Sequence, residues 1–100
     1  MEMNRLRDAA ASIYGRQRWV TELSHRVSIS ASTLRRWAKG EGNPPHADVE
    51  QRIYDALLAR VYEAAFSIRM LFPSRVQISL VGNNLVVSFS RVTSVAREAE

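Results

Sequence analysis

Residues Trp19 to Gly40, WVTELSHRVSISASTLRRWAKG, constrain the fold more than any other stretch, because apolar residues recur there at helical spacing in two short runs. The first run places Trp19, Leu23 and Val27 one helical turn apart from one another. This spacing predicts a short helix over residues 19–26 with a single apolar stripe. So short a helix buries its stripe only against a neighbouring element, which the second run supplies.

The second run follows Ser30, whose hydroxyl is suited to accept a hydrogen bond from the free amides that open a helix. Leu34 and Trp37 then recur at helical spacing and predict a helix over residues 31–39. Gly40 supplies the left-handed residue that ends it. Two short helices joined by a tight connection cross steeply and have helix-turn-helix geometry. Their shared seam is expected to contain Leu23, Val27, Ile29, Leu34 and Trp37.

The pattern L-S-x-x-V-S-I-S-x-S-T-L-x-x-W-x-x-G over residues 23–40 resembles the signature of the Cro/C1-type helix-turn-helix regulators of phages and bacteria. The resemblance covers residues 16–45. The family usually has glycine where this chain has Ser28, a change that costs about 1 kcal/mol if the position requires a positive φ. It also usually has Thr-Gln where this chain has Trp19-Val20, which removes one expected phosphate contact. The resemblance implies a sequence-specific transcriptional regulator of phage or mobile-element type, in particular a repressor.

A recognition helix places its N-terminal half in the major groove, where each base pair presents a distinct pattern of donors and acceptors. Arg36 is the strongest candidate for base reading, because a guanidinium can bond to guanine O6 and N7 together. The positions that match the base-reading residues of the family are Ala31, Ser32, Arg35 and Arg36.

Contacts with the DNA backbone are expected from cationic and hydrogen-bonding side chains around the two helices. Two alternatives stand beside this prediction: Arg16 and Arg18 are solvated loop charges, and Trp19 is simply a core residue. The predicted phosphate contacts are Arg16, Arg18, Trp19, Thr33, Lys39 and Asn43.

The distribution of charge favours the same surface. The chain carries a net charge of +4, and residues 15–40 alone hold six basic residues against the single acidic Glu22, a balance of +5. The positive excess therefore coincides with the helix-turn-helix pattern, and two independent signals on one segment favour a surface that binds phosphates.

The rest of the chain predicts an α+β fold. A helix is expected over residues 2–14 and a long one over residues 49–72, the latter with a broad apolar stripe that Pro73 ends. Alternating apolar residues then predict a β-hairpin over residues 76–90. With Asn83-Asn84 as a two-residue turn, Leu80 would face Val87 and Ile78 would face Phe89, although a slip of two residues keeps the same apolar face.

We therefore predict a helical domain over residues 1–72, a hairpin over 73–92 and a tail, frayed or briefly helical, over 93–100. A lone hairpin is marginal in water and has open edges. The Cro-type resemblance implies that C-terminal strands pair across a two-fold axis, which predicts a homodimer reading an inverted-repeat operator. The long helix is expected either to contribute to this dimer or to lie in an intramolecular core. The predicted dimer contacts are Leu71, Phe72, Ile78, Leu80, Val87 and Phe89.

Composition and spacing argue against other function classes. The chain has no cysteine, which fits a reducing cytoplasm and a nucleoid-associated protein. His25 and His46 lack metal-ligand spacing, and no pattern indicates a catalytic triad or a cofactor, so we expect a protein that is not an enzyme. No apolar stretch is long enough for a membrane span or a signal peptide. The alternatives are an antitoxin-like or adaptor protein whose hairpin or long helix binds a protein partner, and a non-specific architectural DNA-binding protein.

Overall fold

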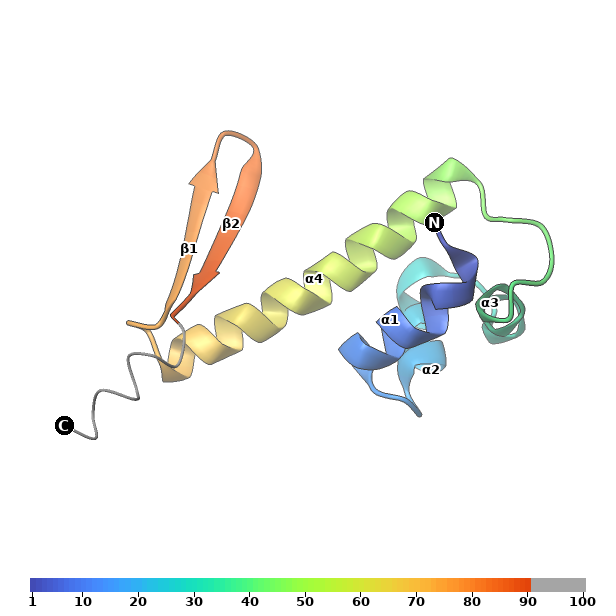
Figure 1. Cartoon of the computed structure of the whole chain (residues 1–100), viewed down its shortest axis with the longest axis horizontal. Helices are drawn as coiled ribbons and strands as arrows, with labels where there is room; N and C mark the ends of the chain where they lie inside the picture. The colour runs from blue at the N-terminus through green and yellow to red at the C-terminus, as the bar shows by residue number, and fades with distance from the viewer. Residues whose placement is uncertain (91–100) are drawn as a thin grey trace. The chain divides into compact units, whose positions relative to one another are not determined.

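The computed structural model describes residues 1–90, which form a 3₁₀ turn, four α-helices and a two-stranded antiparallel sheet (Figure 1). The predicted α+β class, with a long fourth helix and a C-terminal hairpin, is confirmed. The elements are η1 (Met3–Arg5), α1 (Leu6–Tyr14), α2 (Trp19–Val27), α3 (Ala31–Ala38), α4 (Ala47–Leu71), β1 (Val76–Val81) and β2 (Asn84–Phe89).

The chain divides into two compact units within α4, one comprising residues 1–61 and the other residues 62–100. This division falls earlier in the chain than the predicted domain boundary at residue 72. The predicted tail over residues 93–100 and the last two residues of the predicted hairpin segment lie outside the described residues.

The first unit is built on one apolar core, to which α1, α2, α3 and the first part of α4 all contribute (Figure 1). Periodic apolar residues on each helix supply it. The predicted stripes on α2 and α3 are buried as expected, whereas Tyr54 and Val61 on the apolar stripe of α4 are 60% and 45% exposed. Ile29, between α2 and α3, packs against the same core and completes the predicted seam. The buried residues are Leu6, Ala10, Trp19, Leu23, Val27, Leu34, Trp37 and Ile53.

The connection between α2 and α3 is short and tightly specified. Ser28 ends α2 in the left-handed region at φ 58° and ψ 41°, the conformation that a glycine would adopt at lower cost. Ser30 then caps α3, since its hydroxyl accepts a hydrogen bond from the amide of Thr33 at 3.3 Å. Gly40 follows α3 at φ 75°, which confirms its predicted role in ending the helix.

Two long side-chain contacts attach α4 to the helix-turn-helix. The guanidinium of Arg52 donates to the carbonyl of Val27 at 3.0 Å and so satisfies an acceptor at the C-terminal end of α2. The hydroxyl of Tyr14 donates to the carbonyl of Ala56 at 3.0 Å and ties the end of α1 to α4. Both bonds meet α4 within one helical turn, at Arg52 and at Ala56, and they tie α2 and α1 to it.

The hairpin has a different register from the predicted one. Ile78 pairs with Val87 and Leu80 pairs with Leu85, so the predicted pairings of Leu80 with Val87 and of Ile78 with Phe89 are wrong. The turn consists of residues 82 and 83, because Gly82 adopts φ 62° and neither asparagine has a positive φ. A glycine at the first central position followed by a residue of negative φ is typical of a type II′ turn.

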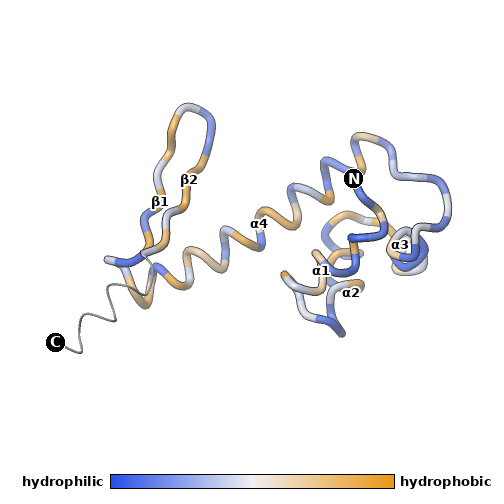
Figure 2. Tube along the Cα trace, viewed as in Figure 1, coloured by the Kyte–Doolittle hydropathy of each residue, from blue (hydrophilic) through white to orange (hydrophobic). Residues whose placement is uncertain are grey.

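The second unit leaves much of its apolar surface uncovered within residues 1–90. Val76 and Ala65 are buried, and the hydroxyl of Tyr62 donates to the carbonyl of Leu85 at 3.4 Å. Apart from these residues, the apolar residues drawn in orange on both strands and at the end of α4 in Figure 2 are largely exposed. The exposed large apolar residues of this unit are Phe66, Ile68, Met70, Leu71, Phe72, Leu80, Val81, Leu85, Val86 and Phe89.

Candidate nucleic-acid interface

The exposed face of α3 carries the candidate site. Leu34 and Trp37 are buried on the inner side of the helix, whereas Ser32 and the cations Arg35, Arg36 and Lys39 are exposed. These exposed residues are spaced by three and four positions and therefore share one face. Ala31 and Thr33, at the start of the helix, are half-buried. Ser32, Arg35 and Arg36, three of the four predicted base-reading residues, thus lie along the outward side of α3, with Lys39 at its end.

The inner side of α3 holds this face in place. Trp37 packs in the core and its indole N–H donates to the carbonyl of Asn43 at 2.8 Å. The burial of Trp37 confirms its predicted inward position, and the bond anchors the segment that follows the helix. The hydroxyl of Ser30 donates to that of Thr33 at 2.8 Å and lies 3.3 Å from that of Ser32. The start of α3 therefore has a small hydroxyl network, and the side chain of Thr33 takes part in the cap.

Within residues 1–61 the cations fall into two groups. Most have a partner: Arg5 and Arg7 contact the carboxylates of Glu2 and Asp8, and Arg52 contacts a backbone carbonyl. Arg18 and Arg26 both contact Glu22, and Arg60 also takes part in an interaction. Among the described residues, the cations of this unit with neither an ion pair nor a hydrogen bond are Arg16, Arg35, Arg36 and Lys39. All four are predicted DNA contacts.

Arg36 lies beside the loop that follows α3. A Cβ atom placed on Gly42 would come within 3.1 Å of its Nη2 atom, so the guanidinium rests against the backbone at Gly42. An exposed arginine without an ion pair changes rotamer on the nanosecond scale. Base reading by Arg36 therefore requires its side chain to leave Gly42.

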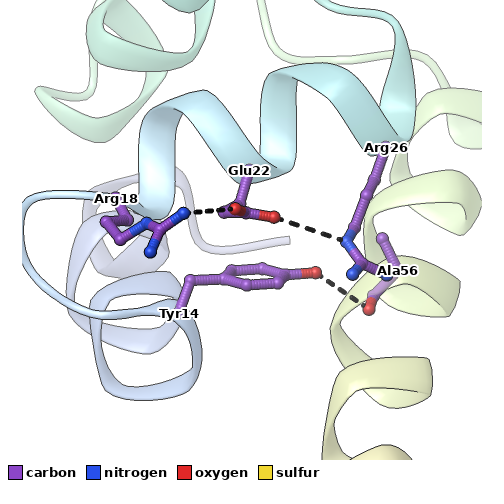
Figure 3. A network of polar contacts seen from close by, with 5 residues as sticks. All are labelled: Tyr14, Arg18, Glu22, Arg26 and Ala56. Carbon is purple, nitrogen blue, oxygen red and sulfur yellow. Dashed lines mark hydrogen bonds and ion pairs between the residues drawn. The ribbon is translucent and has the colours of Figure 1, made fainter.

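Arg18, another predicted phosphate contact, takes part in a polar network beside α2 (Figure 3). The carboxylate of Glu22 lies 3.4 Å from Nη2 of Arg18 and 4.0 Å from Nε of Arg26. The guanidinium of Arg26 also stacks on the ring of Tyr14, 5.6 Å from its centroid. Glu22 and Arg26 were missed as site residues, although their spacing of four residues was a readable signal for an ion pair.

The remaining predicted phosphate contacts differ in accessibility. Trp19 is only 5% exposed and belongs to the core, so packing is its principal role. Its indole N–H has no hydrogen-bond partner among the described residues. Every fully buried side-chain nitrogen among these residues does have a partner, so the indole N–H of Trp19 is at least partly accessible to solvent. Asn43 is exposed, and its side chain is available even though its backbone carbonyl accepts from Trp37.

The predicted dimer contacts are also mostly exposed. Leu71 is 76% exposed and Leu80 is 70% exposed, and Phe72 and Phe89 are about half exposed. Phe72 additionally lies under the guanidinium of Arg75, 6.0 Å from the ring centroid. Ile78 and Val87, which pair with each other, are half-buried. Four of the six predicted contacts are therefore open to a partner.

Two other kinds of site, a metal site and a membrane-spanning helix, were considered for the described part of the chain. Within residues 1–90 no three His, Asp or Glu side chains gather where they could hold a metal ion, and both histidines are exposed. None of the helices described there combines the length and apolar character needed to cross a membrane. Comparison with protein-family models, with curated proteins and with solved structures found no match.

Proposed function

We propose that this protein is a sequence-specific DNA-binding regulator that inserts α3 into the major groove. The observation that carries the proposal is the outward face of α3, where three cations without partners among the described residues stand on a helix fixed from beneath by Leu34 and Trp37. A rigid helix with free guanidinium groups is what base-edge and phosphate contacts require.

In this proposal Ala31, Ser32, Arg35 and Arg36 read bases. Arg16, Lys39 and Asn43 contact the backbone, as do Arg18, Thr33 and the N–H edge of Trp19. The protein acts on the nucleoid in the cytoplasm as a repressor, by occupying an operator that overlaps a promoter. Two subunits read half-sites about 34 Å apart, which doubles both the contacts and the sequence information.

Exposed apolar surface in the second unit supports assembly. Ten large apolar side chains from Phe66 onward are each at least 36% exposed. Exposed apolar residues gathered in this way mark a surface at which proteins associate. A second subunit that pairs with an open edge of the hairpin would cover much of this surface.

The same surface favours a second candidate function, in which the protein is an antitoxin-like or adaptor protein and a different protein covers the second unit. Solution size separates the two readings. A chain of 11.3 kDa that is a stable dimer alone fits the regulator, whereas one that aggregates until a partner is co-expressed fits the adaptor.

The decisive test is selection of bound duplexes from a random pool, followed by affinity measurements on Arg36→Ala. We expect the selection to yield an inverted repeat. Arg36→Ala should lose about 1–3 kcal/mol of discrimination at one position of each half-site and retain weak binding that is sensitive to salt. Arg5→Ala removes the same charge from an exposed arginine outside α3 and serves as the control. Unchanged sequence preference in Arg36→Ala would remove it from the base-reading set, and equal affinity for all duplexes would indicate an architectural protein.

A further inference from the structure

A polar hollow of about 210 Å³ lies in the first unit beside α2. Its lining brings together three guanidinium groups and one carboxylate, of which only Arg60, on α4, is far from the others in the sequence. Figure 3 shows four of the lining side chains, and in it Glu22 lies between Arg18, the N-cap residue of α2, and Arg26, near the end of α2. The lining residues are Tyr14, Arg18, Glu22, Arg26 and Arg60.

The carboxylate of Glu22 is held loosely in this hollow. Its oxygens lie 3.4 and 4.0 Å from the nitrogens of Arg18 and Arg26, beyond the 2.7–2.9 Å of a strong charge-assisted hydrogen bond. The side chain of Arg18 is 75% exposed, and those of Arg26 and Glu22 are each 36% exposed. Exposed ion pairs of this length contribute little to stability, so a better anion can replace the carboxylate.

Arg26, in contrast, is held in position. Arg26 stacks on the ring of Tyr14, and the hydroxyl of Tyr14 is itself fixed by the carbonyl of Ala56. Arg18 is the N-cap residue of α2, and its guanidinium reaches Glu22 one turn along the same helix. A side chain that is already positioned loses less entropy when it binds.

We propose that this hollow is a binding site for a phosphate group, with Arg18, Arg26 and Arg60 as its cationic ligands and Glu22 as an internal competitor. A phosphate presents more oxygens and more charge than the carboxylate it displaces. The hollow is several times the ~30 Å³ that a water molecule occupies, which leaves room for a group of five heavy atoms.

Two sources supply the same chemistry: a phosphodiester of a DNA backbone and a free phosphorylated small molecule. The site itself does not depend on DNA binding, because inorganic phosphate alone tests it. Duplex binding then identifies the source.

The experiment is a titration of the full chain with inorganic phosphate, monitored by two-dimensional NMR. The pH is fixed and the ionic strength is held constant with chloride. We expect saturating shifts centred on the amides of Arg18 and Glu22 and on the Nε of Arg26. Glu22→Gln should tighten binding by roughly five- to tenfold, the effect of removing one negative charge about 4 Å from the ligand in a solvated site. Arg26→Gln should weaken binding by a similar factor, and Arg5→Gln, an equal loss of charge outside the hollow, should leave it unchanged.

Shifts that rise linearly without saturation, or equal affinity in all four proteins, would overturn the proposal. If the occupant is a DNA phosphate, Glu22→Gln raises duplex affinity and steepens its salt dependence by about one counterion relative to Glu2→Gln. If the occupant is a free small molecule, phosphate still binds, but Glu22→Gln and Glu2→Gln bind duplex with the same affinity. A protein that binds phosphate but no duplex would retain this site and refute only the proposed DNA-binding function.

Discussion

Ser28 offers the sharpest test of the turn between α2 and α3. Among the described residues it is the only non-glycine residue with a positive φ, at 58°. The left-handed region costs a residue with a Cβ about 1–2 kcal/mol. Glycine removes this cost but gains unfolded-state entropy worth about 0.4–1 kcal/mol. We therefore expect Ser28→Gly to stabilise the protein by about 1 kcal/mol.

Chemical and thermal unfolding followed by circular dichroism measure this difference. A gain of about 1 kcal/mol raises the melting temperature of a domain of 60–100 residues by roughly 4–8 °C. The urea midpoint should rise with an unchanged slope, because the surface exposed on unfolding is the same. The hydroxyl of Ser28 has no hydrogen-bond partner among the described residues, so the substitution removes no contact within them.

Ser12→Gly is the matched control, since it makes the same chemical change on an exposed position inside α1. A glycine within a helix costs about 0.5 kcal/mol relative to serine, and this variant also loses the bond from the Ser12 hydroxyl to the carbonyl of Asp8. The two substitutions should therefore have opposite signs. A Ser28→Gly protein no more stable than the parent would refute the left-handed assignment of the turn.

Three further outcomes follow from specific contacts. Ser30→Ala removes the cap of α3 and should lower the free energy of unfolding by about 1 kcal/mol in urea. Trp37→Phe keeps the packing but loses the bond to the carbonyl of Asn43; we expect a loss of about 1 kcal/mol and faster amide exchange after α3. Leu80→Asp should convert a dimer to a monomer in light scattering without unfolding it, because Leu80 is exposed, whereas Ser79→Asp on the opposite face should leave the mass unchanged.

The sequence was most informative where local chemistry decides the structure. The cap at Ser30, the end of α3 at Gly40 and the inward position of Trp37 each depend on residues within one or two turns, and all three predictions are confirmed. Ser28 was identified as the place where serine replaces a favoured glycine, and its positive φ is what the pattern required.

The hairpin register shows where such reasoning ends. Alternation fixes which residues share a face, but a slip of two positions preserves that face and changes every pairing. The choice depends on which residue takes the positive φ of the turn. Gly82 does so at less cost than Asn83, so the turn begins one residue earlier than predicted.

Contacts between distant segments were not predictable from one sequence. The bonds from Arg52 to Val27 and from Tyr14 to Ala56 join residues 25 and 42 positions apart. The position of the Arg36 guanidinium against Gly42 likewise depends on how the loop after α3 folds back. These contacts decide which arginines are committed to the fold and which are not.

The lack of ion-pair partners among the described residues for the cations of α3 has an energetic consequence for this helix. The helix contains no acidic residue, and Arg35 and Lys39, four positions apart, place like charges on neighbouring turns. Such a pair destabilises a helix by a few tenths of a kcal/mol, and a glutamate at either position would reverse the sign. Elsewhere in the same unit, Arg18 and Arg26 have a glutamate at that spacing. The unpaired cations of α3 therefore weaken the isolated fold slightly, and a polyanion that binds this face would supply the missing negative charge. The uncompensated positive charge on α3 supports the proposal that this face binds a duplex.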